Sequence, residues 1–224
     1  MNVIPSTILD NFLDNPHDIR DWGLSLEYKP DPYNKWPGKR SPFLHLINPE
    51  LHNYLGKKVM NLFFDTPPLN WKATMEFQLI SNLEGTGWIH QDYAQFTSLL
   101  YLTPESEVNC GSSLYKLKKG KYYPYTSPQE QEINNLRLNH YKTQKLPNNI
   151  SELKNEYEET TYEKVMDVKD KYNRLFMFSS NEFHAANYYS PSNGEDRLTL
   201  VMFFEDILHP KGLPVFRSKQ TTML

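Results

Sequence analysis

The sequence predicts a mainly β fold with flanking helices, an antiparallel sandwich or jelly roll. After Pro67-Pro68, short apolar segments alternate with turn residues such as Gly85-Thr86-Gly87, and no helices are interspersed among them. Aromatic residues make up 14% of the 224-residue chain, whereas its mean hydropathy of -0.68 is polar. This combination is typical of one domain with an aromatic core, long loops and polar insertions.

Strands and helices are expected in separate parts of the chain. The predicted strands are 71–81, 96–102, 113–117, 174–179, 183–189 and 197–205. The Ser-Pro-Ser-Asn-Gly turn at 190–194 predicts that the last two strands form a hairpin. Helices are expected from Pro16, behind the candidate N-cap Asn15, to about Glu27, and from Pro49 to Asp65.

Four regions follow from these patterns. Residues 1–70 provide helical and loop support, with a proline-rich loop at 29–42. Residues 71–117 and 173–205 form the β core. Residues 118–172 are polar and predict an insertion or lid without strands, carrying a helix from about 149 to 159. The last residues, from Pro210, read as a tail packed on the outside or frayed.

Composition narrows the functional class. The formal net charge is -3 and the pI about 6.2, which disfavours nucleic acid and anionic membranes as partners. The single cysteine, Cys110, excludes an intrachain disulfide and a cysteine-based zinc site. The N-terminus does not resemble a signal peptide, and no apolar run reaches transmembrane length. We therefore expect a cytoplasmic protein that acts on a small molecule or a peptide, with an undetermined oligomeric state.

Three separated motifs indicate a metal centre. In His90-Gln91-Asp92, alternate side chains of an extended segment face the same way and can converge on one ion. His184 follows an apolar strand and precedes two alanines, which leave space beside its ring. Two histidines and one carboxylate form a facial triad of the kind that holds non-haem Fe(II) with three open positions.

Arg197 and Thr199 lie on one face of the last predicted strand. A guanidinium leading an apolar strand is costly unless it is paired, and its fork binds a carboxylate in bidentate fashion. The alternative is an edge arginine that pairs with Glu195 or Asp196. Gln78, Tyr101 and Asn187 are weaker candidates for the lining of the same pocket, each more plausibly structural, and Trp88 is expected to be a packing wall. The Lys116 to Tyr125 run is interpreted as a solvated loop.

With these motifs, the sequence resembles the Fe(II)/2-oxoglutarate-dependent oxygenase superfamily, in particular its prolyl-4-hydroxylase-like branch of small bacterial and phage members. The resemblance covers about residues 71–205 and rests on GWIHQD, FTSLLYLTP, NRLFMFSSNEFHAAN and RLTLVMFF. The family's Gly-Gly-x-Leu element reads Gly111-Ser112-Ser113-Leu114 here, so only its first glycine is kept. The resemblance implies a double-stranded β-helix, a cupin-like jelly roll, as the fold of a single oxygenase domain.

The resemblance also implies a chemistry. His90, Asp92 and His184 would bind Fe(II) as metal ligands and catalytic residues, and Arg197, helped by Thr199, would hold the far carboxylate of 2-oxoglutarate. Dioxygen would complete a hydroxylation, with a prolyl residue as the first candidate substrate and a free amino acid or another small molecule next. The presence of Asp92 favours hydroxylation over halogenation. Three alternatives stay open: a cupin-like metal protein that does not use 2-oxoglutarate, a catalytically silent binding module, and an oxygenase that repairs nucleic acid.

Overall fold

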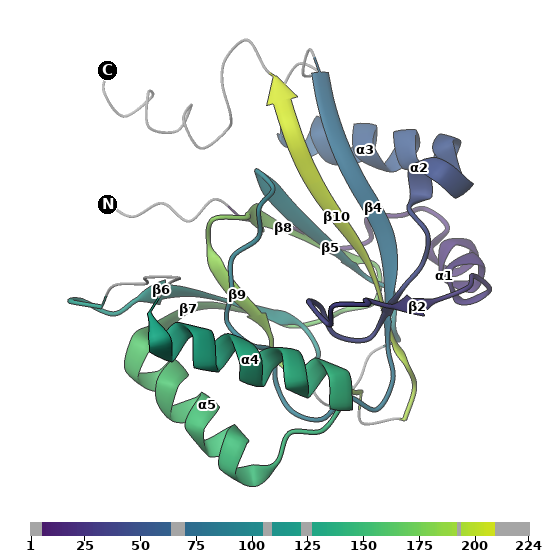
Figure 1. Cartoon of the computed structure of the whole chain (residues 1–224). Coiled ribbons are helices and arrows are strands. Elements are labelled where there is room, and N and C mark those ends of the chain that lie inside the picture. The colour runs from purple at the N-terminus through teal and green to yellow at the C-terminus, as the bar shows by residue number, and fades with distance from the viewer. Residues whose placement is uncertain (1–5, 64–69, 105–108, 122–126, 192–193, 209–224) are drawn as a thin grey trace, which may run out of the picture.

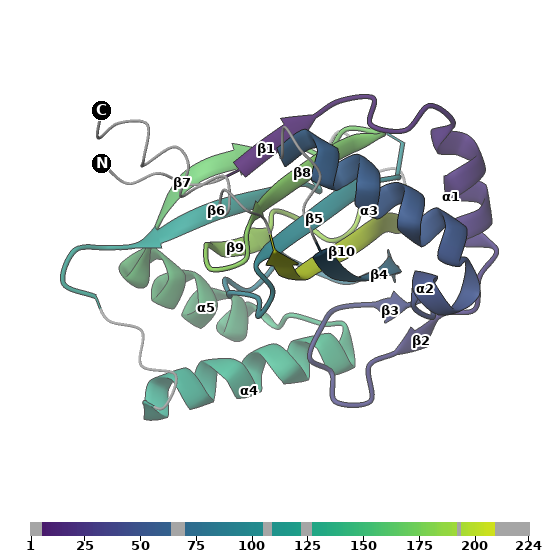
Figure 2. The same ribbon diagram turned by 90° about the horizontal axis from the view of Figure 1, so that it is seen from above.

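Two β-sheets face each other, and helices cover their outer sides (Figures 1 and 2). The computed structural model describes residues 6–63, 70–104, 109–121, 127–191 and 194–208. The larger sheet has the order β1-β8-β5-β10-β4-β3-β2, and the smaller sheet has the order β7-β6-β9. The predicted tail from Pro210 and part of the Lys116 to Tyr125 run lie outside the described residues.

The bounds of the elements follow the chain. The strands of the larger sheet are β1 (Ser6–Leu9), β2 (Lys29–Pro30), β3 (Lys39–Arg40), β4 (Asn70–Ile80), β5 (Phe96–Tyr101), β8 (Arg174–Ser179) and β10 (Arg197–Leu208). Those of the smaller sheet are β6 (Ser112–Leu117), β7 (Tyr162–Val168) and β9 (Phe183–Ala186). The helices are α1 (Pro16–Leu24), α2 (Leu44–Ile47), α3 (Pro49–Phe63), α4 (Pro128–Thr143) and α5 (Asn148–Thr161).

The topology is the predicted jelly roll. All strand pairs in both sheets are antiparallel. After β4 the chain crosses to the smaller sheet at His90, which forms an isolated bridge with His184, and returns to the larger sheet as β5. The next strands, β6 and β7, lie in the smaller sheet, and β8 lies in the larger one. The chain then enters the smaller sheet once more as β9 and returns to the larger sheet as β10. Successive crossings of this kind bring residues from distant parts of the sequence into the space between the two sheets.

The strand β10 shows how side-chain alternation divides this fold into a core and a cavity. Leu198, Leu200 and Met202 belong to the main core between the larger sheet and the helices. Arg197 and Val201, on the opposite face, line the cavity between the sheets. Burial of one large apolar side chain stabilises the fold by about 1.5–3 kcal/mol, so the outer face anchors the strand while the inner face remains available for polar residues.

The predicted hairpin of the last two strands is wrong. The strand β9 pairs with β6 in the smaller sheet, whereas β10 lies between β5 and β4 in the larger one. Hairpin loops usually have two to five residues, and the longer segment 187–196 instead spans the separation between the sheets, which is about 10 Å in packed sheets. Turn residues alone did not distinguish a hairpin from a crossing.

The region 118–172 contains a strand that the sequence analysis did not predict. The strand β7 pairs with β6 along its whole length, and it was missed because charged residues interrupt its apolar pattern on an edge strand. The helix α4 was also missed, although Ser127 accepts a hydrogen bond from the backbone N–H of Glu130 at 3.2 Å. This Ser-Pro-Gln-Glu signature of a helix start was readable in the sequence.

Candidate metal centre

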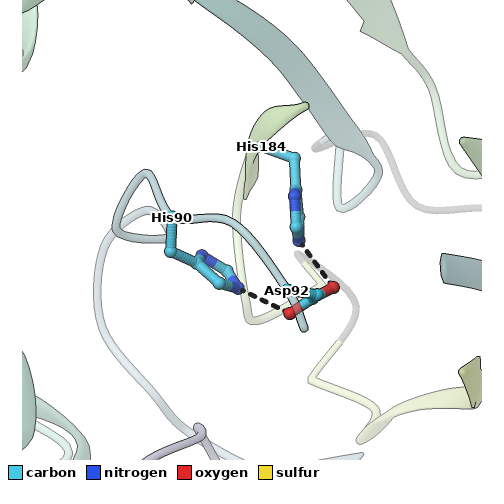
Figure 3. Close-up of side chains that lie close together, drawn as sticks. All are labelled: His90, Asp92 and His184. Atoms are coloured by element: carbon cyan, nitrogen blue, oxygen red, sulfur yellow. Dashed lines mark ion pairs between the residues drawn. The ribbon is translucent and has the colours of Figure 1, made fainter. Parts of the chain in front are cut away.

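The side chains of His90, Asp92 and His184 point toward one another (Figure 3), and all three line the same cavity. One ligand atom from each residue can be chosen so that all lie within 4.8 Å of one another. The Nε2 atom of His90 is 3.7 Å from Oδ1 of Asp92, and the Nε2 atom of His184 is 3.2 Å from Oδ2. Two imidazoles and one carboxylate at these separations could hold a divalent metal ion.

Backbone pairing brings the three residues together. The N–H groups of His90 and His184 each donate to the other's carbonyl, at 3.0 and 2.8 Å, and the N–H of Asp92 donates to the Ser180 carbonyl at 3.0 Å. Gly87 extends the same pairing, with its N–H 2.8 Å from the Ala186 carbonyl. A Cβ atom at Gly87 would lie 2.5 Å from the Ala186 nitrogen, so this close approach of two backbones requires glycine.

Both imidazoles are oriented for metal binding by backbone carbonyls. The Nδ1 atom of His90 lies 2.8 Å from the Trp88 carbonyl, and that of His184 lies 3.0 Å from the Glu182 carbonyl. A carbonyl only accepts, so each Nδ1 carries a proton, and in the neutral imidazole each Nε2 presents its lone pair. Hydrogen bonds of this type fix the tautomer and the ring direction of metal-binding histidines.

The Asp92 carboxylate has a support of its own. The hydroxyl of Thr97, on β5, donates to Oδ2 of Asp92 at 2.7 Å and lies 2.9 Å from the Ser180 hydroxyl. Thr97 was not predicted as a site residue, because nothing in its sequence context distinguishes it from other strand threonines.

The electrostatic environment gives Asp92 and His90 the protonation states that a metal needs, whereas the Asp92 carboxylate favours the protonated form of His184. Burial lowers the pKa of His90 to about 4, and the positive charge of His184 adds to this effect. Burial alone would also lower the pKa of His184, but the Asp92 carboxylate outweighs it and raises that pKa. Burial alone would raise the pKa of Asp92, yet the charge of His184 and its hydrogen bond hold that pKa well below the usual range. At neutral pH, Asp92 is ionised and His90 is neutral, as metal binding requires.

A cavity that is partly open to solvent is lined by the triad and by Arg197. Arg197 is 4% exposed, and its Nε donates to the Cys110 carbonyl at 2.9 Å. No ion pair of Arg197 is found within the described part of the chain, and the alternative partner Glu195 instead lies 3.5 Å from Arg20. A buried guanidinium without a carboxylate is costly unless an anion joins it.

Of the remaining predicted residues, Gln78 lines the cavity, whereas Thr199, Tyr101 and Asn187 do not. Thr199, two residues along the same face from Arg197, is fully buried, and its hydroxyl has no partner among the described residues. Tyr101 lies under Arg197, with its ring centroid 5.8 Å from the guanidinium carbon. Gln78 lines the cavity and donates to the Pro37 carbonyl at 2.8 Å. Asn187 does not line it, and its side chain instead contacts Ser113 at 2.6 Å and Asp167 at 2.8 Å.

The helices α4 and α5 hold the segment that carries His90. Trp88 is 1% exposed, as expected for a packing wall, and its Nε1 donates to Nδ1 of His140 at 2.9 Å. The buried Lys154 binds Glu158 at 2.7 Å and Thr86 at 2.9 Å. Glu158 also accepts the N–H of Ile89 at 3.1 Å. The region 118–172 therefore supports the metal centre and does not only cover it.

The chain matches the model of a family of unknown function, DUF6445, over residues 3–204. The chain belongs to this family. No curated protein matches the sequence.

Solved structures show the fold that this DUF6445 chain shares. HygX from Streptomyces hygroscopicus, with nickel and 2-oxoglutarate bound, is 10% identical with a TM-score of 0.56, over 90% of this chain and 83% of HygX. SnoN, a non-haem alpha-ketoglutarate-dependent epimerase from nogalamycin biosynthesis, is 13% identical with a TM-score of 0.54, over 93% of this chain and 82% of SnoN. The chain has the jelly-roll fold of the Fe(II)/2-oxoglutarate oxygenases. Within the described residues, no helix is long and apolar enough to cross a membrane.

Proposed function

We propose that this protein is an Fe(II)- and 2-oxoglutarate-dependent dioxygenase that hydroxylates a substrate still to be identified. The observation that carries the proposal is the triad, in which both Nε2 atoms face Asp92 while both Nδ1 atoms are tied to backbone carbonyls. This donor set suits Fe(II), and it leaves positions for a 2-oxo acid and dioxygen. HygX, which shares the fold, has been solved with iron bound and with nickel and 2-oxoglutarate bound.

Arg197 and Thr199 supply the support for 2-oxoglutarate as the co-substrate. Among the described residues, no carboxylate forms an ion pair with the buried guanidinium, although the buried Asp170 lies within electrostatic range, and the neighbouring Thr199 hydroxyl is buried without a hydrogen-bond partner. An unsatisfied buried polar group costs about 1–3 kcal/mol, so a ligand carboxylate at this place would satisfy both. Tyr101 would hold the guanidinium in position through its ring, and Gln78 would hold the cavity wall.

The chain's own residues would bind the metal, orient its ligands and exclude water from the centre. His90, Asp92 and His184 would hold Fe(II), which supplies the activation of dioxygen coupled to oxidative decarboxylation of 2-oxoglutarate to succinate and carbon dioxide. Thr97 would keep the Asp92 carboxylate in its binding orientation. Phe178, whose ring centroid is 4.7 Å from that of His184, would shield the centre from water. A prolyl residue as the substrate stays a prediction of the family resemblance.

The test is release of succinate that depends on 2-oxoglutarate and Fe(II), measured against a panel of prolyl peptides, amino acids and other small molecules. His90→Ala and Asp92→Ala should abolish it, whereas His45→Ala, at an exposed histidine outside the cavity lining, should not. Metal binding without succinate release for any panel member would favour the cupin-like alternative. Failure to bind metal at all would favour the silent binding module.

A further inference from the structure

The cavity is more cationic than the chain that forms it. The whole sequence has 24 basic and 27 acidic residues. The described residues that line the cavity nevertheless include one carboxylate, Asp92, and four permanent cations: Lys35, Arg40, Arg137 and Arg197. Cations in a partly desolvated cavity are costly when they lack partners. This applies to the buried Arg197 and the half-buried Arg40 and Arg137, whereas Lys35 is exposed.

Two of the four cations have partners. In the proposed function, Arg197 binds the far carboxylate of 2-oxoglutarate. Arg40 forms an ion pair with Glu76, and its guanidinium carbon lies 4.4 Å from the Trp36 ring centroid. Glu76 therefore neutralises the charge of Arg40. The Arg40 guanidinium also packs on the indole of Trp36, the residue that follows Lys35 in the chain.

Arg137 is one of the two cations that remain. It projects from α4, has no ion pair within the described chain, and donates from one terminal nitrogen to Oδ1 of Asn134 at 2.7 Å. Its Nε is buried and lacks a partner among the described residues. The guanidinium is thus oriented by a neutral amide, which leaves its charge available at the cavity.

Lys35 is the other cation that remains, and it lies in the loop between β2 and β3. This loop lies beside the C-terminal half of α4 in both views (Figures 1 and 2). The loop is held by hydrogen bonds from the Lys35 N–H to Asp31 at 2.5 Å and from Gln78 to the Pro37 carbonyl at 2.8 Å. The Lys35 side chain is exposed, and its ammonium lies 5.3 Å from the Tyr33 ring centroid. No carboxylate forms an ion pair with this ammonium in the described part of the chain, so Lys35 and Arg137 line one cavity from two different elements without an anionic partner.

We propose that the primary substrate is a small carboxylic acid whose carboxylate binds between Arg137 and Lys35, at the mouth of the cavity that leads to the triad. This assignment deepens the proposed function and rests on it, because the same cavity would hold the iron and 2-oxoglutarate. An arginine fork and a lysine ammonium together match the geometry and the charge of a carboxylate. Trp36, Tyr141 and Tyr189 also line the cavity, and they give the rest of the substrate an aromatic wall.

The experiment compares acids with their neutral counterparts. A panel of N-acetyl and N-benzoyl amino acids, each paired with its primary amide, is titrated by calorimetry into the protein saturated with Fe(II) and 2-oxoglutarate without oxygen. At least one acid should bind ten times more tightly than its amide or better. Arg137→Gln and Lys35→Gln should each reduce that preference at least fivefold, while circular dichroism confirms that the variants are folded.

Matched controls separate the local cations from general charge. Lys142→Gln, on the exposed side of α4, and Lys39→Gln, on β3, remove one exposed charge each outside the cavity lining and should leave the preference unchanged. The proposal is overturned if no acid binds more tightly than its amide, or if the preference survives in both Arg137→Gln and Lys35→Gln. A separate titration with 2-oxoglutarate shows whether the proposed function itself fails. The acid and amide titrations are then repeated without metal and 2-oxoglutarate, and they still test whether a carboxylate binds between Arg137 and Lys35.

Discussion

Thr97 connects the larger sheet with the metal centre through one hydroxyl. Its side chain is 2% exposed, and β5 places it in register with Phe203 and Phe178. From there the hydroxyl donates to Asp92, which carries the only negative charge among the three candidate ligands. Residues that orient a metal ligand contribute to metal affinity although they do not touch the metal.

Thr97→Val removes this hydroxyl and keeps the shape of the side chain. We expect metal affinity to fall roughly 10- to 100-fold, the usual cost of losing such a support, as measured by titration with Co(II) or Mn(II). Thr97→Ser retains the hydroxyl and should keep most of the affinity. Equal affinities for the valine and serine variants would show that the hydrogen bond to Asp92 has no role in metal binding.

At the scale of elements, the N-terminal strand is fastened to the larger sheet by Asp10. The strand β1 pairs with β8 at the sheet edge, and Asp10 follows it directly. The Asp10 carboxylate accepts from Nε of Arg174 at 2.6 Å and from Lys171 at 3.0 Å. Hydrogen bonds from Arg174 and then Lys171 lower the pKa of Asp10 to about 2.

This lowered pKa predicts a pH-dependent contribution to stability. A carboxyl group with a depressed pKa in the folded state stabilises the fold above its unfolded value, here 3.8, and loses that contribution as pH falls toward about 2. Asp10→Asn should therefore be less stable than the wild type at pH 5, by on the order of 1 kcal/mol because the pair is partly exposed to solvent. The gap, measured by urea denaturation, should narrow by pH 3. A gap that stays constant with pH would contradict this account.

At the scale of the whole molecule, the triad joins parts of the chain that only folding brings together. Asp92 and His184 come from opposite sides of the 118–172 region, and the pairing of His90 with His184 is one of the contacts that extend the smaller sheet. A metal ion held by all three would bind the folded chain and not the unfolded one, so it should raise the free energy of unfolding.

Thermal unfolding with and without a divalent metal measures this linkage. At a metal concentration of about 100 times Kd, the expected gain is about 2.7 kcal/mol, or a rise in Tm of roughly 5–10 °C for a chain of this size. A chelator should reverse the rise, and Asp92→Ala should not show it. A rise of the same size in Asp92→Ala would place the metal elsewhere.

Much of this architecture was predictable because local patterns carry it. The long helix α3 and most core strands were expected within a few residues of their observed bounds, since apolar periodicity reports the buried face. Local signals were weaker at β7, an edge strand with alternating charges, and at the short strands β2 and β3, which pair over two residues each. These elements depend on their neighbours more than on their own residues.

The sequence by itself determined the jelly-roll class, the three candidate ligands and the buried arginine, because strand alternation and ligand chemistry are properties of residues and their local spacing. The sequence also showed that Gly111 is the one glycine kept from the family's element, but only the structure gives the reason: a Cβ there would lie 1.9 Å from the Val168 carbonyl. Only the tertiary structure decided that β9 and β10 lie in opposite sheets, that α4 and α5 support His90, and that Lys35 and Arg137 face one cavity. These contacts join residues far apart in the chain. The free energy that stabilises them comes from side-chain packing and strand pairing between distant segments, which no local pattern encodes.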